Sequence, residues 1–120
     1  MTDKKTINLI NNIKLLLDES IKLHKIYKDN GSKFLYTKKI LVINKKILTI
    51  IDNKVFLIPN QLKEPFFILK KHITEWIYCW NQNKNKLNPV DIDVFIFHGY
   101  STFPTGFDNA LSSFLKNEEY

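Results

Sequence analysis

The chain contains no arginine, and this absence weighs against one class of function. Its 18 basic side chains other than histidine are all lysines, and its formal net charge is +6. Arginine presents a planar fork of five donors that grips phosphates and guanine edges in pairs, whereas lysine offers one mobile point charge. Base-specific reading of nucleic acid is therefore not expected. Codon usage can also explain the lysines. The chain has 13 Asn, 16 Ile and a single Ala, and an AT-rich coding sequence favours Lys, Asn and Ile codons together.

Cysteine is nearly absent too, and long apolar runs are missing. A single thiol, Cys79, excludes an intramolecular disulfide and a cysteine-based zinc site, so the expected compartment is a reducing cytoplasm. The longest apolar runs, such as 40–43 and 94–97, fall far short of the roughly 20 residues that span a bilayer. Residues 1–5 lead into no compact apolar stretch or cleavage site of a secretory signal. We expect no association with a membrane.

What the chain does contain is enough apolar material for one packed core. Of its 120 residues, 44% are apolar and 13% are aromatic, which predicts a single domain over residues 1–120. The charge is uneven: residues 1–86 carry 17 Lys and 7 acidic residues, whereas residues 87–120 carry one Lys and five acidic residues. A basic body with an acidic end can orient a charged partner.

Apolar residues recur at helical spacing in three segments. The predicted helices are 5–29, 64–82 and 107–116. Asn30 and Gly31 supply the left-handed stop expected after the first helix. The polar, Asn- and Lys-rich stretch 81–89 follows the second helix and is expected to be a mobile loop.

Residues 34–59 are β-branched and aromatic, and short polar breaks interrupt them. The predicted strands are 40–43, 47–51, 55–58 and 90–98, with 34–37 as an extra edge strand. The breaks at 44–46 and 52–54 favour hairpin turns. The element order is then α-β-β-β-α-β-α, which predicts an α+β fold with a mostly antiparallel sheet and helices packed on one face.

Two acidic residues, Asp91 and Asp93, lie on one face of the predicted strand 90–98, roughly 7 Å apart. Two carboxylates at that spacing can hold Mg²⁺ or act as an acid/base pair. Solvated charges at the start of a strand, which keep its edge from pairing, are the reading we favour. His98 belongs to the opposite face of a regular strand. We expect no metal, no cofactor and no catalytic group.

The stretch 98–106 joins a predicted strand to a predicted helix. Its hydroxyl groups and backbone amides could cradle an anion at the helix start, but the stretch has neither a lysine nor a P-loop pattern, and no Gly-x-Ser-x-Gly elbow surrounds Ser101. An ordinary loop is the plainer interpretation. It nevertheless holds the densest set of polar and aromatic groups in the chain, and we expect a binding surface there.

The remaining aromatic and histidine side chains fit a packed helix. Trp76 and Trp80 share one helical face and are expected in the core, with Cys79 buried or half-buried among them, whereas Tyr78 is expected on the surface. His24 and His72 lack further ligands at helical spacing, so we interpret both as satisfied or solvated histidines.

Three classes of function remain. The first is a non-enzymatic protein-binding module, such as an inhibitor, an immunity-type protein or an adaptor, and we rank it first because the chain is small and lacks a catalytic motif. The alternative is a sequence-tolerant nucleic-acid binder that uses its lysine surface. The third is a small enzyme that uses Asp91, Asp93 or the 98–106 loop.

We expect a protein partner to meet the return strand, the 98–106 loop and the last helix. The residues predicted to contact it are Asp91, Asp93, His98, Tyr100, Ser101, Phe103 and Asp108. Pairing of two copies into a homodimer through an edge strand is a further expectation, because strand edges can add a neighbouring strand.

Overall fold

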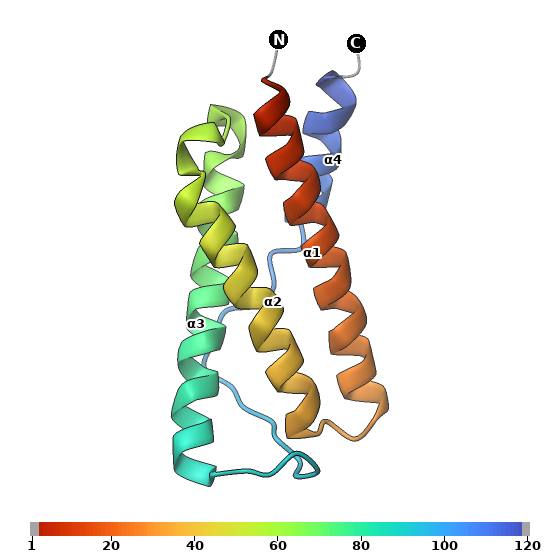
Figure 1. Ribbon diagram of the computed structural model, residues 1–120, viewed down its shortest axis with the longest axis vertical. Helices are drawn as coiled ribbons and strands as arrows, with labels where there is room; N and C mark the ends of the chain where they lie inside the picture. The colour runs from red at the N-terminus through yellow and green to blue at the C-terminus, as the bar shows by residue number, and fades with distance from the viewer. Residues whose placement is uncertain (1–2, 119–120) are drawn as a thin grey trace.

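Four α-helices and one long extended connection make up the fold. The computed structural model describes residues 3–118 (Figure 1). The helices are α1 (Lys4–Asp29), α2 (Phe34–Asn53), α3 (Lys63–Leu87) and α4 (Phe107–Glu118), with single 3-10 turns at Val55–Leu57 and Asn60–Leu62. Within residues 3–118 there is no strand, and one isolated antiparallel bridge joins Lys33 to Val94. The α+β fold predicted from the sequence is therefore wrong.

The helices alternate in direction and form an elongated bundle of 50 × 24 × 20 Å. In Figure 1, α1 and α3 run downward and α2 and α4 upward, with α4 beside the first half of α1. Lys14 of α1 donates a hydrogen bond to the hydroxyl of Ser112 of α4, at 3.1 Å. Because α4 is only 12 residues long and α1 has 26, the fourth position of the bundle is helical in its upper half alone. Residues 88–106, here called the connecting segment, fill the lower half.

The predicted first helix is confirmed. Leu9, Ile10, Ile13 and Leu17 of α1 are buried on one stripe, as their spacing requires. The carboxylate of Asp3 accepts a hydrogen bond from the backbone amide of Lys5 and so caps the helix start. At the other end, the chain leaves the helix through Gly31, whose φ of +82° is the left-handed conformation that glycine adopts without strain.

The three-strand meander predicted for residues 34–59 is wrong, because most of that stretch is helix α2. Its buried residues are Phe34, Thr37, Ile40, Ile43, Asn44, Ile47 and Ile51. These positions recur at helical steps, and the polar breaks at 44–46 and 52–54 are parts of helical turns rather than hairpins. β-branched residues lower helix propensity only slightly, and burial of a continuous apolar stripe outweighs that cost.

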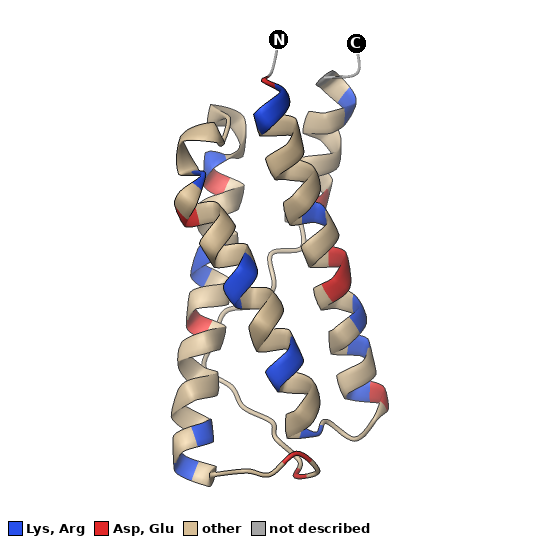
Figure 2. Cartoon of the chain, viewed as in Figure 1, with Lys and Arg blue, Asp and Glu red and all other residues tan. Residues whose placement is uncertain are grey.

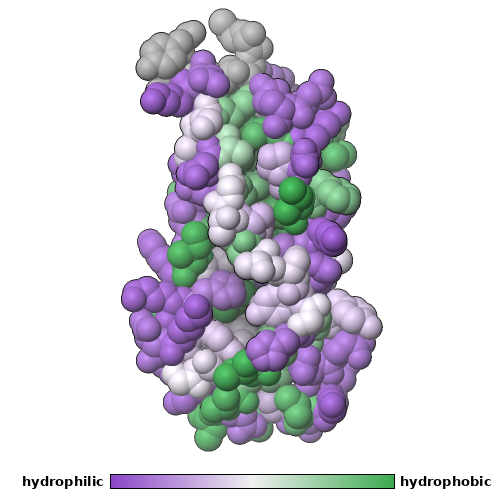
Figure 3. Space-filling view, turned by 180° about the vertical axis from the view of Figure 1, so that it is seen from behind, coloured by the Kyte–Doolittle hydropathy of each residue, from purple (hydrophilic) through white to green (hydrophobic). Residues whose placement is uncertain are grey.

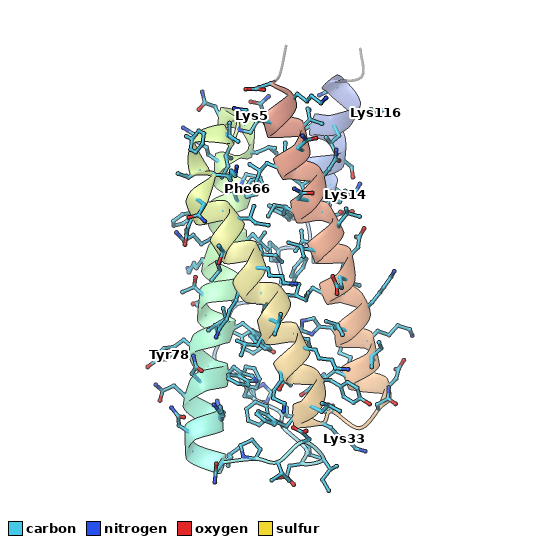
Figure 4. The ribbon with its side chains drawn as sticks, in the orientation of Figure 1. Lys5, Lys14, Lys33, Phe66, Tyr78 and Lys116 are labelled. Carbon is cyan, nitrogen blue, oxygen red and sulfur yellow. The ribbon has the colours of Figure 1, made fainter. Side chains whose placement is uncertain are left out.

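The second predicted helix is confirmed but longer than expected. α3 buries Trp76 and Trp80, and Figure 4 shows Tyr78 pointing away from the bundle. The mobile loop predicted at 81–89 is wrong, since α3 continues to Leu87 and ends at the left-handed Asn88. Within this polar turn, the side-chain amide of Asn83 donates to the carbonyl of Cys79 at 2.8 Å, which supports the last turns of the helix.

The strand predicted over 90–98 is wrong in its first part, because residues 90–93 form a turn in which the amide of Asp93 donates to the carbonyl of Val90 at 3.0 Å. From Val94 onward the segment is extended but joins no sheet. Its side chains alternate as expected of a strand, since Phe95 and Phe97 are buried and Val94 and Ile96 are exposed. Phe95 and Phe97 pack on helices rather than on other strands, and the segment thus covers the lower half of the bundle. The predicted last helix is confirmed as α4.

Two clusters of buried side chains divide the interior. The upper core is mainly aliphatic and combines α4 with parts of the three long helices; its residues include Ile10, Ile47, Leu69, Phe107 and Leu111. The lower core is mainly aromatic and is completed by the connecting segment; its residues are Phe34, Ile40, Trp76, Cys79, Trp80, Phe95 and Phe97. The prediction that Cys79 is buried among aromatic side chains is confirmed.

Candidate functional site

The connecting segment positions most of the residues that the sequence singles out. Its first part closes the lower end of the bundle, its middle part is extended, and its last part lines a cavity between α1 and α3. Each part has different chemistry.

Asp91 and Asp93 hold the start of α2 rather than facing each other as a pair. Their backbone carbonyls accept hydrogen bonds from the amides of Leu35 and Phe34, at 3.1 and 2.8 Å respectively. These amides belong to the first turn of α2, which has no side-chain cap of its own, so the connecting segment satisfies donors that would otherwise lack a partner.

The two carboxylates are engaged separately. The Asp91 carboxylate forms an ion pair of 2.5 Å with Lys38, and the Asp93 carboxylate accepts from the amide of Val90 at 2.9 Å. Within residues 3–118, no three His, Cys, Asp or Glu side chains are grouped so that they could hold a metal ion. The arrangement therefore favours the structural interpretation of these two acids.

The middle of the segment is extended, with one edge bonded to residues 32–34 and the other edge open. Phe34 donates its amide to the Asp93 carbonyl, and Phe95 donates to the Ser32 carbonyl, both at 2.8 Å. This pattern makes Lys33 and Val94 a non-hydrogen-bonded antiparallel pair, so the amide and carbonyl of Val94 point away from Lys33. Among the backbone hydrogen bonds of the described residues, none uses the amide or the carbonyl of Val94 or Ile96.

The same stretch exposes a row of large apolar side chains. Ile92, Val94 and Ile96 are 75%, 66% and 56% exposed, and Val90 precedes them at 60%. Val90 and Ile92 belong to the turn before the extended stretch, and Val94 and Ile96 alternate along it. We call the exposed surface of Ile92, Val94 and Ile96 the 92–96 edge. The lower part of the back face shows a green, apolar patch between hydrophilic side chains in Figure 3.

The last part of the segment lines a cavity of about 770 Å³ that all three histidines of the chain share. We call it the histidine cavity. Its lining residues are Ser20, Ile21, His24, Lys25, Lys28 and Asp29 of α1, His72 and Trp76 of α3, and His98–Phe103. Figure 3 shows the hollow near the middle of the back face. The volume lies within the range of small-molecule sites.

His72 is the best-fixed group in the cavity. Its Nδ1 lies 2.7 Å from the carbonyl oxygen of Ser101. A carbonyl can only accept, so Nδ1 carries the proton and the other ring nitrogen, Nε2, is left as an acceptor in the neutral ring. The rings of Phe103 and Tyr100 meet the imidazole edge-on, with centroids at 5.4 and 6.0 Å.

Burial disfavours the protonated forms of His24 and His72. Burial lowers the pKa of His72 below its usual value, although its hydrogen bond to Ser101 and the nearby Glu75 oppose this. Burial also lowers the pKa of His24, and the proximity of His72 and Lys28 lowers it further. Two imidazoles whose charged forms are disfavoured by burial therefore line one hollow.

Glu75 fixes the loop from the α3 side. Its Oε1 accepts a hydrogen bond from the amide of Ser101 at 3.3 Å, and hydrogen bonding to Ser101 lowers the pKa of the Glu75 carboxyl. Ser101 is thus held by two α3 side chains one turn apart, Glu75 and His72.

Gly99 turns the chain from the 92–96 edge into the cavity. Its φ of +105° is a conformation that other residues rarely adopt, and a Cβ at this position would lie 3.2 Å from the sulfur of Cys79. Glycine permits both the backbone conformation and the close packing of the turn on α3.

The structure brings together some of the predicted contact residues and separates others. His98, Tyr100, Ser101 and Phe103 line the histidine cavity. Asp91 and Asp93 lie at the lower end of the bundle, and Asp108 is exposed in the first turn of α4.

Sequence reasoning missed His24 and His72 as members of the site. Each lies on a different helix, and no local spacing relates them to His98. A helical pattern shows which residues share a face of one helix, but it does not show which faces meet.

The lysines are distributed over all four helices, and Lys33 and Lys54 lie in the connections between helices (Figure 2). They do not single out one element as a surface for phosphates. The lysine-based nucleic-acid binding predicted from the sequence stays a prediction.

No helix within residues 3–118 is both long and apolar enough to cross a membrane. Comparison of the chain with protein-family models, with curated proteins and with solved structures found no match.

Proposed function

We propose that this protein is a protein-binding module that pairs its 92–96 edge with an extended segment of a partner protein. The observation that carries the proposal is the coincidence of an open backbone edge with the exposed row Ile92, Val94 and Ile96. Recognition by strand addition uses both features, because the backbone supplies affinity and alternate side chains supply specificity.

The open edge restricts the kind of partner. The amide and carbonyl of Val94 point away from the edge that is already bonded to Ser32 and Phe34, and those of Ile96 make no backbone hydrogen bond within the described residues. A partner helix satisfies its own backbone internally, whereas a strand has donors and acceptors at the matching repeat. An extended partner therefore fits this edge better than a helical one.

Charge around the edge favours acidic residues flanking the partner strand. Lys33 lies opposite Val94, and Figure 4 shows it at the lower end of the molecule. Lys84 and Lys86 lie in the last turn of α3, directly before the connecting segment (Figure 2). Asp91 is already paired with Lys38. We thus expect a strand with alternate apolar side chains between acidic flanks, presented in the reducing cytoplasm that a single free thiol favours.

Binding of a designed peptide tests this function. The probe is a fluorescent peptide in which valine alternates with threonine over five positions, between pairs of glutamates. Wild type is compared with Val94→Pro, which removes an outward amide, and with Ile92→Lys, which interrupts the apolar row. Leu15→Lys is the matched control, since Leu15 is 67% exposed on α1. We expect at least tenfold weaker binding for the two edge variants and unchanged binding for the control.

Two results would overturn the proposal. One is equal binding of a peptide with the same composition in scrambled order. The other is sedimentation of the free chain as a dimer that Val94→Pro dissociates, which would assign the edge to a second copy. Circular dichroism of each variant separates loss of binding from loss of fold.

A further inference from the structure

The histidine cavity is separate from the 92–96 edge, and its chemistry points to a small ligand. The three histidines of the chain come from α1, α3 and the connecting segment and meet at one hollow of about 770 Å³. A smaller hollow of about 230 Å³ adjoins it and shares His24, Lys28, Trp76, His98 and Tyr100. The 92–96 edge uses none of these five side chains and lines no part of the larger hollow, although its Ile96 lines the smaller one.

The cavity offers donors and positive charge. Lys25 and Lys28 line it, and Lys25 pairs with Asp29 at 3.4 Å, which leaves Lys28 without a carboxylate partner within the described residues. Four hydroxyl-bearing residues, Ser20, Tyr100, Ser101 and Thr102, line the same hollow. Lysine, hydroxyl and protonated imidazole are all donors to an oxyanion.

The cavity also has an apolar wall. Ile21, Trp76 and Phe103 line it, and Ile21 is 55% exposed on the α1 side. Binding sites for small organic molecules combine an apolar surface with a few convergent polar groups. A bare inorganic ion would leave this wall uncovered.

We propose that the histidine cavity binds a small organic oxyanion, a carboxylate or phosphate on an apolar body, and that a proton enters the cavity with it. The neutral Nε2 of His72 has no partner within the described residues, and it becomes a donor to the anion once it is protonated. An anion beside His24 and His72 favours their charged forms, which burial disfavours in the free protein. Binding and proton uptake are then reciprocally coupled.

Several charged and titratable groups surround these two imidazoles. They are Lys25, Lys28 and Asp29 on α1, Glu75 on α3, and His98 and Tyr100 on the connecting segment. Asp29 is paired with Lys25 and Glu75 is bonded to Ser101, so neither acid takes the place of an incoming anion at His72. Within residues 3–118 the acids and histidines are not grouped for a metal ion, and the two lysines oppose a cation.

Calorimetric titration with four probes tests this site. Phenyl phosphate and 3-phenylpropionate carry the two anionic groups on an apolar ring, inorganic phosphate lacks the ring, and benzyl alcohol lacks the charge. We expect binding of one or both ring-bearing anions, with affinity that increases as pH falls from 7.5 to 6, by at most about tenfold per pH unit for one proton. The better of the two anions identifies the headgroup.

Variants tie the binding to named side chains. In His72→Asn, the amide nitrogen can replace Nδ1 at the Ser101 carbonyl while the titrating Nε2 is lost, so we expect weaker binding and a reduced pH response. Combining it with His24→Gln should abolish the response. Lys28→Gln should weaken the anions severalfold, and Lys45→Gln, an exposed lysine on α2 away from the cavity, should not.

Imidazole signals in nuclear magnetic resonance spectra give a readout apart from affinity. The ring-bearing anion should raise the midpoint of titration of His24 and His72. The proposal is overturned if benzyl alcohol binds as well as the anions, if no probe binds at millimolar concentration, or if Lys45→Gln weakens binding as much as Lys28→Gln.

Discussion

The two halves of the bundle differ in what fills the fourth position beside the three long helices. In the upper half it is α4, which buries Phe107, Leu111 and Phe114 and hydrogen-bonds its own backbone. In the lower half it is an extended segment, which buries Phe95 and Phe97. An extended chain must find its backbone partners elsewhere.

This difference accounts for the location of both proposed sites. The connecting segment bonds one edge to Ser32 and the start of α2, which leaves its 92–96 edge open. It also bends away at Gly99, so the corner that α4 fills above contains the histidine cavity below. Where an extended segment completes the bundle, the surface keeps both an open backbone edge and the histidine cavity.

Aromatic packing is what allows so thin a segment to cover three helices. The ring of Phe95 lies 5.0 Å from that of Phe34, and the ring of Phe97 lies 5.3 Å from that of Trp76. Phe34 in turn stacks on Trp80 at 5.6 Å. Large rings bury much area per residue, which compensates for the few side chains that an alternating segment turns inward.

The largest expected effect tests whether the connecting segment contributes as much to the free energy of unfolding as α4 does. Phe95 is 1% exposed and Leu111 is fully buried. We expect Phe95→Ala to lower the free energy of unfolding by about 3–5 kcal/mol and Leu111→Ala by about 2–5 kcal/mol. Ile96→Ala, on the outward face of the same segment, should change it by less than about 0.5 kcal/mol. Urea denaturation measures all three; if Phe95→Ala matches Ile96→Ala, the lower half is not closed by this segment.

The next effect concerns the turn that separates edge from cavity. Gly99→Ala forces a side chain into a backbone conformation with φ of +105° and against the sulfur of Cys79. We expect a loss of about 1–3 kcal/mol in the free energy of unfolding. Gly106→Ala is the control, because a Cβ there meets no atom within 4 Å and φ is not positive. Equal melting temperatures for the two variants would contradict the role given to Gly99.

Lowering the pH should reduce the free energy of unfolding, because His24 and His72 are buried in the lower half of the bundle. Burial lowers the pKa of His24 and His72 in the folded protein, so the unfolded chain binds more protons as pH falls below about 6.5. The stabilisation is therefore complete above pH 6.5 and decreases as pH falls toward and through the lowered values. Urea midpoints at pH 7.5 and 5.5 measure the decrease, and His24→Gln combined with His72→Asn should reduce it. An unchanged decrease would place its origin elsewhere.

The smallest effect compares one exposed ion pair from each half. Lys38 pairs with Asp91 in the lower half, and Lys70 pairs with Asp52 in the upper half at 2.6 Å; all four side chains are about half exposed. We expect Asp91→Asn and Asp52→Asn each to cost about 0–1 kcal/mol. A much larger cost for Asp91→Asn would show that its carboxylate, and not only its backbone carbonyl, holds the segment on α2. Thermal melts at low and high salt separate the two contributions.

Most of the helical structure could be predicted from the sequence, because one-sided apolar spacing shows on the chain itself. Residues 5–29, 64–82 and 107–116 all lie in helices. Helix α2 was the error: its β-branched residues suggested strands, although Phe34, Ile40 and Ile47 keep a helical register and the stretch contains no glycine for tight turns. The helical period should have outweighed residue preference.

The candidate sites were predictable in part. Alternation gave the correct inward and outward side chains over 94–97 but not over the turn at 90–93, and residues 98–103 of the polar, aromatic loop line a cavity. The open edge was not predictable, because it depends on which edge Ser32 and Phe34 occupy. The position of His24 and His72 in the histidine cavity was not predictable either, because it depends on how α1 and α3 face the connecting segment.

By itself, the sequence determined the elements that depend on local period: one-sided helices and one alternating segment with phenylalanine inward. Only the tertiary structure decided that this segment takes the place of half a helix, and that His24, His72 and His98 meet. The reason is physical. Local spacing sets which side of an element is apolar, whereas the choice among apolar neighbours is made by contacts between residues far apart in the chain.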